Sequence, residues 1–219
     1  MNFSDSFFEN SNSIQIANKF EALSDQKNNV KPSSVPPKYN HRLTHSKIKL
    51  MSININGIRG KKLELSSFLE IEDPDIIAIQ ETKIDKYILT SELFPDNFNY
   101  DVYRNDRTLN GGGVILLVNK THISMPLYNL ENGSESVWAK IMFDGSPHFF
   151  GCWYKDPESP SDHIQLLDDQ LIKIGCLNNT KKSLNIHLMG DFNFPAIDWN
   201  ENTGPNTFVK VKAKLLLIY

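Results

Sequence analysis

The chain has 219 residues, of which 40% are hydrophobic, so it is long enough for one domain with a buried core. Its formal net charge of −3 excludes a strongly basic nucleic-acid-binding protein, so any contact with DNA must come from local lysines and arginines. The two cysteines, Cys152 and Cys176, have the pattern of small buried residues without a disulfide. Neither a secretory leader nor a membrane-spanning apolar run is visible in the sequence. We therefore expect a protein of the nucleus or cytoplasm that is not secreted.

Composition divides the chain into three parts. Residues 1–46 are rich in Asn, Ser and Lys and contain several prolines, which predicts a disordered leader. Within the leader, residues 14–23 have the pattern of one short amphipathic turn or helix. Residues 47–200 alternate apolar runs with turn residues and predict one folded domain, and residues 201–219 are interpreted as a divergent C-terminal tail.

The predicted domain opens with a strand, a helix and a second strand. Residues 48–53 form an apolar strand, apolar residues recur at helical spacing over residues 65–69, and a buried strand leads into Glu81. Such a unit places its two strands parallel with the helix crossing over them. We therefore expect Asn54 and Glu81, which follow the two strands, on the same side of the sheet.

The middle of the chain predicts antiparallel strands. Residues 85–98 have an irregular or briefly helical pattern, and strands over residues 100–104 and 114–119 are joined through three glycines as a hairpin. Residues 137–143 and 147–153 predict a second hairpin. Hairpins flanked by strand-helix units predict an α/β fold, a two-sheet α/β/β/α sandwich with its helices outside.

A Ser-Asp-His triplet precedes the last predicted helix. Because apolar residues at helical spacing follow it, Ser161 or Asp162 is interpreted as the helix N-cap and His163 as a residue of the first turn. Residues 183–189 then predict a buried strand, and Gly190 is expected to turn the backbone where that strand leaves the sheet.

Polar side chains stand at the ends of four predicted strands. They are Asn54, Glu81, Tyr154 and Asp191, and Asn193 follows two positions after Asp191. Strand ends are frequent sites of chemistry in layered α/β folds, and carboxylate and amide oxygens suit magnesium and phosphate. Each motif alone is equally explained by an ordinary turn or strand end, whereas their order along the chain favours a shared site.

These motifs resemble, in their order, the endonuclease/exonuclease/phosphatase family. The resemblance rests on Asn54-Ile55-Asn56-Gly57, Gln80-Glu81-Thr82, the strand-end Tyr154 and Gly190-Asp191-Phe192-Asn193, and it covers roughly residues 48–200. Within the family the chain is most similar to the endonuclease domain of non-LTR (LINE-type, jockey-like) retrotransposons. That narrower similarity rests on Val102 to Arg107, the glycines before Val114, and Glu135 to Trp138.

The resemblance implies a magnesium-dependent phosphodiester hydrolase, with manganese as an alternative ion and DNA as the partner. It implies Glu81 and Asn54 as metal ligands, Asp191 and Asn193 as residues that orient or activate the attacking water, and Tyr154 as a donor to the phosphate. Arg104 and Arg107 are candidates for contacts with DNA phosphates, against the alternative that both are simply solvated. The sequence departs from the family after Tyr154, where Lys155 and Asp156 precede Pro157.

The family pattern ends with a Ser-Asp-His triplet whose histidine serves as general base. Here the triplet precedes Gly-Asp-Phe-Asn, and 28 residues follow Asp191 (219 minus 191), so we expect a C-terminally incomplete domain, a truncated copy that lacks its C-terminal strands. Two alternatives stay open. One is another phosphoesterase of the same fold, acting on abasic DNA, RNA or phosphoinositides, and the other is a catalytically inactive remnant without the general base.

Overall fold

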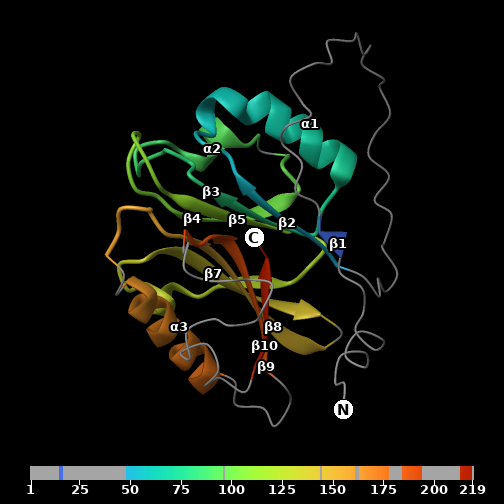
Figure 1. Cartoon of the computed structure of the whole chain (residues 1–219). Coiled ribbons are helices and arrows are strands. Elements are labelled where there is room, and N and C mark those ends of the chain that lie inside the picture. Colours follow the sequence, from blue (N-terminus) through green and yellow to red (C-terminus); the bar gives the residue numbers. More distant parts are fainter. Residues whose placement is uncertain are drawn as a thin grey trace, which may run out of the picture.

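The architecture is a sandwich of two five-stranded sheets with helices on both outer faces (Figure 1). The computed structural model describes residues 15–16, 48–95, 97–143, 145–160, 163–177, 184–193 and 213–218, the first and last of these ranges as backbone alone. Helices α1 (Lys62–Glu72) and α2 (Thr90–Leu93) lie outside the first sheet, and α3 (Ile164–Leu177) lies outside the second. The predicted α/β/β/α sandwich is confirmed.

The first sheet combines three parallel strands with an antiparallel pair. Its order is β1 (Gln15–Ile16), β2 (Lys49–Asn54), β3 (Ile76–Gln80), β5 (Val114–Asn119) and β4 (Tyr100–Asn105). β1, β2 and β3 run parallel, and β5 is antiparallel to both β3 and β4. The short helix η1 (Arg59–Lys61) and α1 connect β2 to β3, so the predicted strand-helix-strand unit and the glycine-rich hairpin are both confirmed.

The second sheet repeats this plan. Its order is β10 (Ala213–Ile218), β9 (Leu184–Asp191), β8 (Ser146–Tyr154), β7 (Glu135–Phe143) and β6 (Ser124–Pro126). β8, β9 and β10 run parallel, whereas β7 is antiparallel to both β8 and β6. The short helix η2 (Tyr128–Leu130) follows β6, and α3 connects β8 to β9. The predicted second hairpin is the pair β7 and β8.

Three apolar layers hold the sandwich together. Alternation along β2 sends Met51 and Ile53 toward α1, where they pack with Leu65 of the helix, and sends Leu50 into the space between the sheets. Phe150 of β8 enters the same inter-sheet layer from the other side. Trp153, Leu167 and Leu171 belong to the third layer, beneath α3. Burial on both faces explains why β3 and β5 read as continuous apolar runs.

The edge strands β1 and β10 lie in segments for which the sequence predicted no strand. β1 is a strand where the sequence indicated a turn or helix, and the rest of the leader 1–46 lies outside the described residues. β10 is a strand within the segment interpreted as a divergent tail. Ser161 and Asp162, the predicted N-cap, lie outside the described residues as well. The prediction that Cys176 is buried is wrong, because it lies on the outer face of α3, whereas Cys152 is buried as expected.

Across the part of the chain that the structure describes, no helix combines the length and apolarity needed to cross a lipid bilayer.

Candidate functional site

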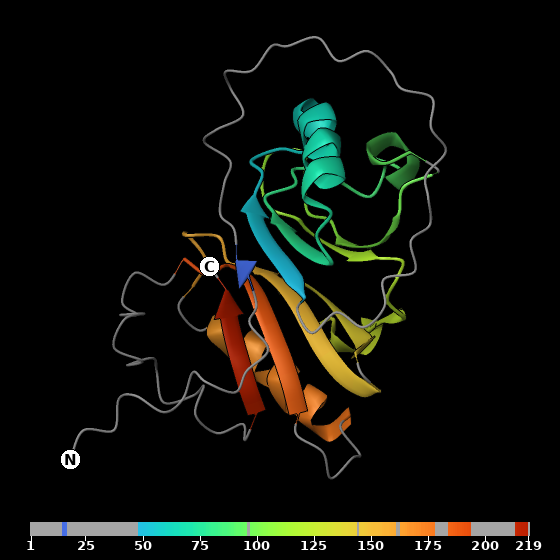
Figure 2. The same ribbon diagram turned by 90° about the vertical axis from the view of Figure 1, so that its right-hand side faces the viewer.

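The candidate site lies where two pairs of parallel strands end. Asn54 ends β2 beside Gln80 of β3 in the first sheet, and Tyr154 ends β8 beside Asp191 of β9 in the second. Figure 2 shows β2 pointing toward the same end of the sandwich as β10, which runs parallel to β9. The four strand ends therefore meet at one end of the molecule, as expected for carboxyl ends of parallel strands.

The side chains that the sequence singled out converge there. Nδ2 of Asn54 donates to Oε1 of Glu81 at 3.2 Å and to Oδ2 of Asp191 at 3.1 Å. The Tyr154 hydroxyl donates to Oε1 of Glu81 at 3.1 Å. The Asn54 amide thus joins two carboxylates that come from different sheets, and the Tyr154 phenol of the second sheet also binds Glu81 of the first. The prediction that Asn54 and Glu81 lie on the same side is confirmed.

Glu81 is held in its charged form. Its burial would raise the pKa, but hydrogen bonds from Asn54, Tyr154 and Lys83, together with the charge of Lys83, outweigh burial and leave the pKa of Glu81 below its usual value. The Lys83 ammonium lies 3.4 Å from Oε2 of Glu81 and also donates to Oδ1 of Asn56. Asn56 thus helps to hold Lys83 beside Glu81.

Tyr154 is held in its neutral form. Burial, the hydrogen bond to Glu81, and the charges of Glu81, Asp156 and Asp191 all raise the pKa of the phenol. A phenol that keeps its proton remains a hydrogen-bond donor throughout the physiological range. Its geometry suits a group that donates to a developing negative charge.

The end of β9 is fixed against the segment that follows β8. The backbone N–H of Lys155 donates to the Asp191 carbonyl at 3.0 Å, and Nδ2 of Asn193 donates to the Lys155 carbonyl at 2.8 Å. Asn193 adopts a left-handed backbone with φ of 45°, which asparagine tolerates better than most residues. Its amide thus ties the two strand ends together in this structure.

Gly190 has a different role from the predicted one. It lies inside β9, opposite Trp153 of β8, and a Cβ at this position would overlap the Trp153 carbonyl oxygen. Its φ of 153° is also a conformation that side chains disfavour. Glycine is required because the neighbouring backbone approaches closely, and the strand continues to Asp191 without the predicted turn.

Left-handed backbone conformations gather around the site. Among the described non-glycine residues, five have positive φ, and four of these are Asn56, Glu81, Lys83 and Asn193. Such conformations cost about 1–3 kcal/mol each and persist only where the surrounding contacts impose them. Hydrogen bonds from Gly57 N–H to the Glu81 carbonyl at 2.8 Å and from Lys83 N–H to the Gly112 carbonyl at 3.0 Å are among the contacts that hold the Glu81 loop.

A buried polar group supports the strands below the site. Nε2 of Gln80 donates to Ser52 Oγ at 3.3 Å and to Cys152 Sγ at 3.3 Å, so it joins β2, β3 and β8 across the two sheets. Burial raises the pKa of the Cys152 thiol to about 12, which keeps the thiol protonated and unreactive. Gln80, which bridges the inter-sheet layer, directly precedes Glu81 and thus helps to fix its position.

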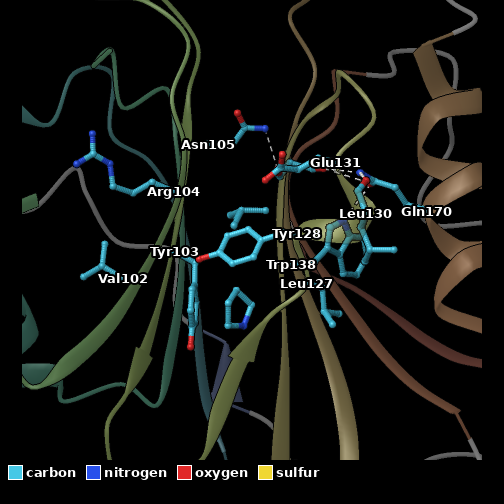
Figure 3. Close-up of a pocket in the computed structure, with 13 residues that line it drawn as sticks. Val102, Tyr103, Arg104, Asn105, Leu127, Tyr128, Leu130, Glu131, Trp138 and Gln170 are labelled. Atoms are coloured by element: carbon cyan, nitrogen blue, oxygen red, sulfur yellow. Dashed lines mark hydrogen bonds between the residues drawn. The ribbon is translucent and has the colours of Figure 1, made fainter. Parts of the chain in front are cut away.

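The two candidate DNA-contacting arginines occupy different places. Arg104 pairs with Asp106 at 2.6 Å and donates to the Ile88 carbonyl at 2.8 Å, and its side chain is 12% exposed. Figure 3 shows it extending away from the second sheet, whereas Asn105 extends toward that sheet. Arg104 thus anchors the segment before α2. Arg107 lies at the rim of the site, where it pairs with Glu135 and Asp156.

A small cavity lies between the sheets on the flank of the sandwich, apart from these strand ends (Figure 3). Tyr103, Trp138 and Gln170 are among its lining residues. Gln170 is fully buried and accepts a hydrogen bond from Nε1 of Trp138 at 3.0 Å. Of the residues that the sequence predicted for the site, Arg104 alone lines this cavity, and none of the strand-end residues Asn54, Glu81, Tyr154 and Asp191 does.

The residues present fit a hydrated hard cation. Glu81 and Asp191 are hard oxygen donors that approach one another through Asn54, and Mg²⁺ is commonly held by one or two carboxylates while it keeps several waters. Among the described residues, no three His, Cys, Asp or Glu side chains are grouped closely enough to enclose a metal by themselves. The site therefore fits an ion whose remaining ligands are waters and substrate oxygens, and it does not fit a closed structural zinc centre.

Sequence reasoning missed three charged members of this end of the sandwich. Lys83 follows Gln80-Glu81-Thr82 directly, and a lysine so close to a strand-end carboxylate was the available signal. Lys155 is 5% exposed, with Nζ donating to the Ser159 carbonyl at 3.2 Å, and Asp156 pairs with Arg107. No local pattern indicates the pairing of Asp156 with Arg107, since the two residues are 49 positions apart.

Fold and site together define a four-layer α/β sandwich with a carboxylate–amide site shared between its two sheets. A model of the Endonuclease/Exonuclease/phosphatase family matches residues 51–208, and the chain belongs to this family.

Similar solved structures include the endonuclease domain of TRAS1, a telomere-specific non-LTR retrotransposon, at 16% identity and a TM-score of 0.48 over 66% of this chain and 58% of that one. The human Nocturnin catalytic domain with bound sulfate is 15% identical, with a TM-score of 0.49 over 67% of this chain and 64% of that one. An AP endonuclease from Archaeoglobus fulgidus is 20% identical, with a TM-score of 0.42 over 59% and 50%. The chain thus spans less than two thirds of the length of each of these structures.

Proposed function

We propose that the chain is a divalent-metal-dependent phosphodiester hydrolase that cuts DNA internally, as the endonuclease domain of a non-LTR retrotransposon. The observation that carries the proposal is the convergence of Asn54, Glu81, Tyr154 and Asp191 at the ends of four strands of two sheets, where three hydrogen bonds of 3.1–3.2 Å link them. A merely structural cluster would have little reason to bring two carboxylates together beside left-handed backbone.

Glu81 and Asp191 are the residues that would hold a magnesium or manganese ion, with Asn54 between them. When bound, the ion would neutralise negative charge on the phosphate during its transfer. Lys83 and the Asn54 amide supply further positive charge and hydrogen-bond donors beside Glu81.

The chain's own residues supply the remaining roles. Tyr154 keeps its proton and can donate to a nonbridging phosphate oxygen as charge builds there. Asp191 can accept a hydrogen bond from the attacking water and orient it, while Asn193 fixes the position of Asp191 through Lys155. A phosphodiester would then be hydrolysed with its reacting atoms held in place by side chains from both sheets.

DNA is the proposed partner because of the family and because of the motifs shared with retrotransposon endonucleases. With a net charge of −3, binding would depend on local basic residues and on the ion at the site. We therefore also propose that the protein works in the nucleus or the cytoplasm.

The test is nicking of supercoiled plasmid by the purified chain with Mg²⁺ or Mn²⁺, and again with a chelator. We expect relaxed circles that require the ion and that Asp191→Ala abolishes. Folded protein that leaves the plasmid supercoiled with either ion would overturn the proposal. Hydrolysis of an abasic-site duplex, an RNA tail or a phosphoinositide in place of the plasmid would instead identify another phosphoesterase of this fold.

A further inference from the structure

We propose that Arg107 is a positioning residue for this site, because its ion pairs with Glu135 and Asp156 hold together the loops that carry the catalytic side chains. These three residues are called the Arg107 clamp below. The inference rests on the proposed function and adds a role that differs from contact with DNA phosphates.

One guanidinium nitrogen joins two carboxylates in the clamp. Nη1 of Arg107 lies 2.7 Å from Oε1 of Glu135, at the start of β7, and 2.9 Å from Oδ2 of Asp156, after β8. The Arg107 side chain is 41% exposed, whereas those of Glu135 and Asp156 are 19% and 27% exposed. Because both carboxylates contact the guanidinium, its charge is largely compensated and is poorly available to a DNA phosphate.

On one side the clamp reaches the loop of Glu81. The second oxygen of Glu135 accepts the Gly113 N–H at 2.8 Å, which fixes the glycine-rich turn against β7. The carbonyls of Gly112 and Gly113 in turn accept hydrogen bonds from Lys83 N–H at 3.0 Å and Thr82 N–H at 3.2 Å. Glu81 therefore lies directly before two backbone groups whose positions depend on this turn.

The glycines allow the clamp to form. Gly112 has a φ of 71°, and a Cβ there would overlap the Glu135 carboxylate and lie 2.5 Å from Cδ of Arg107. Gly113 has a φ of 84°, and its Cβ would lie 2.5 Å from Thr82 Oγ1. The triple glycine, which the sequence indicated only as a hairpin, thus gives Arg107 room to reach both carboxylates.

On the other side the clamp reaches the ends of β8 and β9. Asp156 follows Lys155, whose backbone donates to the Asp191 carbonyl and accepts from Asn193, and Lys155 in turn follows Tyr154. A hydrogen bond from the Glu158 N–H and the Arg107 guanidinium hold the pKa of the Asp156 carboxyl below its usual value. The charge that the clamp needs is therefore present at neutral pH.

A positioning role and a phosphate contact predict different kinetics. Removing a phosphate contact weakens DNA binding and reduces the slope of log affinity against log salt by about 1. Loosening the loops instead lowers kcat and the affinity for the metal, while DNA binding at saturating Mg²⁺ stays the same. Replacing residues that support metal ligands typically costs about 10–100-fold.

The experiment compares Arg107→Met, Arg107→Lys and Asp156→Asn with the unchanged chain. For Arg107→Met we expect a fall of about 10-fold or more in kcat for plasmid nicking and in Mg²⁺ affinity by calorimetry without DNA. KM for the plasmid at saturating Mg²⁺, and its salt dependence, should stay unchanged. Arg107→Lys keeps a charge and should recover part of the loss. In the Asp156→Asn variant, adding Arg107→Met should lower kcat by a smaller factor than it does in the unsubstituted chain, since both substitutions remove the same contact.

The matched control is Glu72→Gln, which breaks an ion pair of similar exposure between Glu72 and Lys49 at the opposite end of the sandwich. It should change neither kcat nor metal affinity. An equal loss in this variant, or an Arg107→Met variant with normal kcat, weakened DNA binding and a smaller salt slope, would overturn the inference.

A third measurement separates this inference from the proposed function. Amide hydrogen exchange at Lys155 should accelerate in Arg107→Met relative to the unchanged chain and to Glu72→Gln, whether or not the protein cuts DNA. If the exchange rate at Lys155 is the same in Arg107→Met as in the unsubstituted chain, the role of the Arg107 clamp is contradicted. If the unsubstituted chain is inactive and binds no metal, only the proposed function is contradicted.

Discussion

Asn54 and Asp191 are separated by 137 positions in the chain, yet Nδ2 of Asn54 donates to Oδ2 of Asp191 at 3.1 Å. This bond crosses from the end of β2 in one sheet to the end of β9 in the other. The site therefore exists only when the two sheets are docked in the correct register, and its chemistry depends on the inter-sheet layer beneath it.

Replacing Glu81 by Gln tests the assigned metal ligand. The substitution keeps the shape of the side chain but removes the charge that Asn54, Tyr154 and Lys83 stabilise. Replacing a residue that only supports a metal ligand typically costs about 10–100-fold. For Glu81→Gln we expect a larger fall in the nicking rate. Glu64→Gln, on the exposed face of α1, is the control and should leave the rate unchanged. Equal activity in the two variants would remove Glu81 from the site.

Replacing Tyr154 by Phe removes a single hydroxyl. If that hydroxyl donates to the phosphate, kcat should fall by about 10²–10³-fold, as for other single donors to developing negative charge. Tyr100 is a similarly buried tyrosine whose hydroxyl donates to the Pro74 carbonyl at 2.9 Å, at the other end of the first sheet. Tyr100→Phe is therefore the control and should leave kcat unchanged. A Tyr154→Phe variant with normal kcat would mean that the phenol only supports Glu81.

The pH dependence follows from the same phenol. Its pKa is raised above the usual 10.0, so the proton that makes Tyr154 a donor stays bound as the pH rises through that value. We therefore expect the nicking rate of the unchanged chain to show no loss attributable to tyrosine ionisation up to about pH 10. A rate–pH profile with a falling limb near pH 9 that Tyr154→Phe abolishes would contradict this.

Gly190→Ala should destabilise the fold. The new Cβ would overlap the Trp153 carbonyl, and relief requires β8 and β9 to separate locally. Such overpacking typically costs about 1–3 kcal/mol, and the unfavourable φ adds to it. Gly175→Ala is the matched control, because no heavy atom lies within 4 Å of the added Cβ in α3. It should stabilise the chain by about 0.5–1 kcal/mol. Urea unfolding of both variants measures the difference, and equal midpoints would refute the account.

Gln170→Leu should also destabilise the fold, through hydrogen bonding. Gln170 accepts from Trp138 Nε1 and donates to the Leu130 carbonyl at 2.8 Å, so leucine would leave two buried groups without these partners. Each such group costs about 1–3 kcal/mol. Gln165→Leu, on the exposed face of the same helix, should stay within about 0.5 kcal/mol of the unchanged chain. Thermal unfolding monitored by Trp fluorescence distinguishes them.

The sequence was most informative where local pattern and physics agree. The strand-helix-strand unit could be predicted because apolar periodicity changes sharply on either side of Pro74, and parallel pairing then places Asn54 beside Glu81. The juxtaposition of Glu81 with Asp191 came from resemblance, since nothing local to either residue specifies how two sheets stack. Gly190 was misinterpreted because a close backbone approach and a turn leave the same signature in sequence.

Other features depend on partners that are distant in the chain. The pairing of Arg107 with Glu135 and Asp156 spans 28 and 49 positions, and a charged residue in a loop is usually solvated, so no local argument favours these partners. β1 has two residues, and β10 lacks the regular alternation of polar and apolar residues that predicts a strand. Both are strands because they pair with β2 and β9. Cys176 was assigned to the core on residue type alone, without regard to its helical face.

The order of the sheets along the chain has a practical consequence. β2 to β5 complete their part of the first sheet by Asn119, and β6 to β9 of the second sheet begin only at Ser124. Proteolytic cleavage in the short connection between β5 and β6 would yield one fragment with Asn54 and Glu81 and another with Tyr154 and Asp191. The fold is thus laid out for complementation, in which two separately inert pieces would recover their chemistry by reassociating.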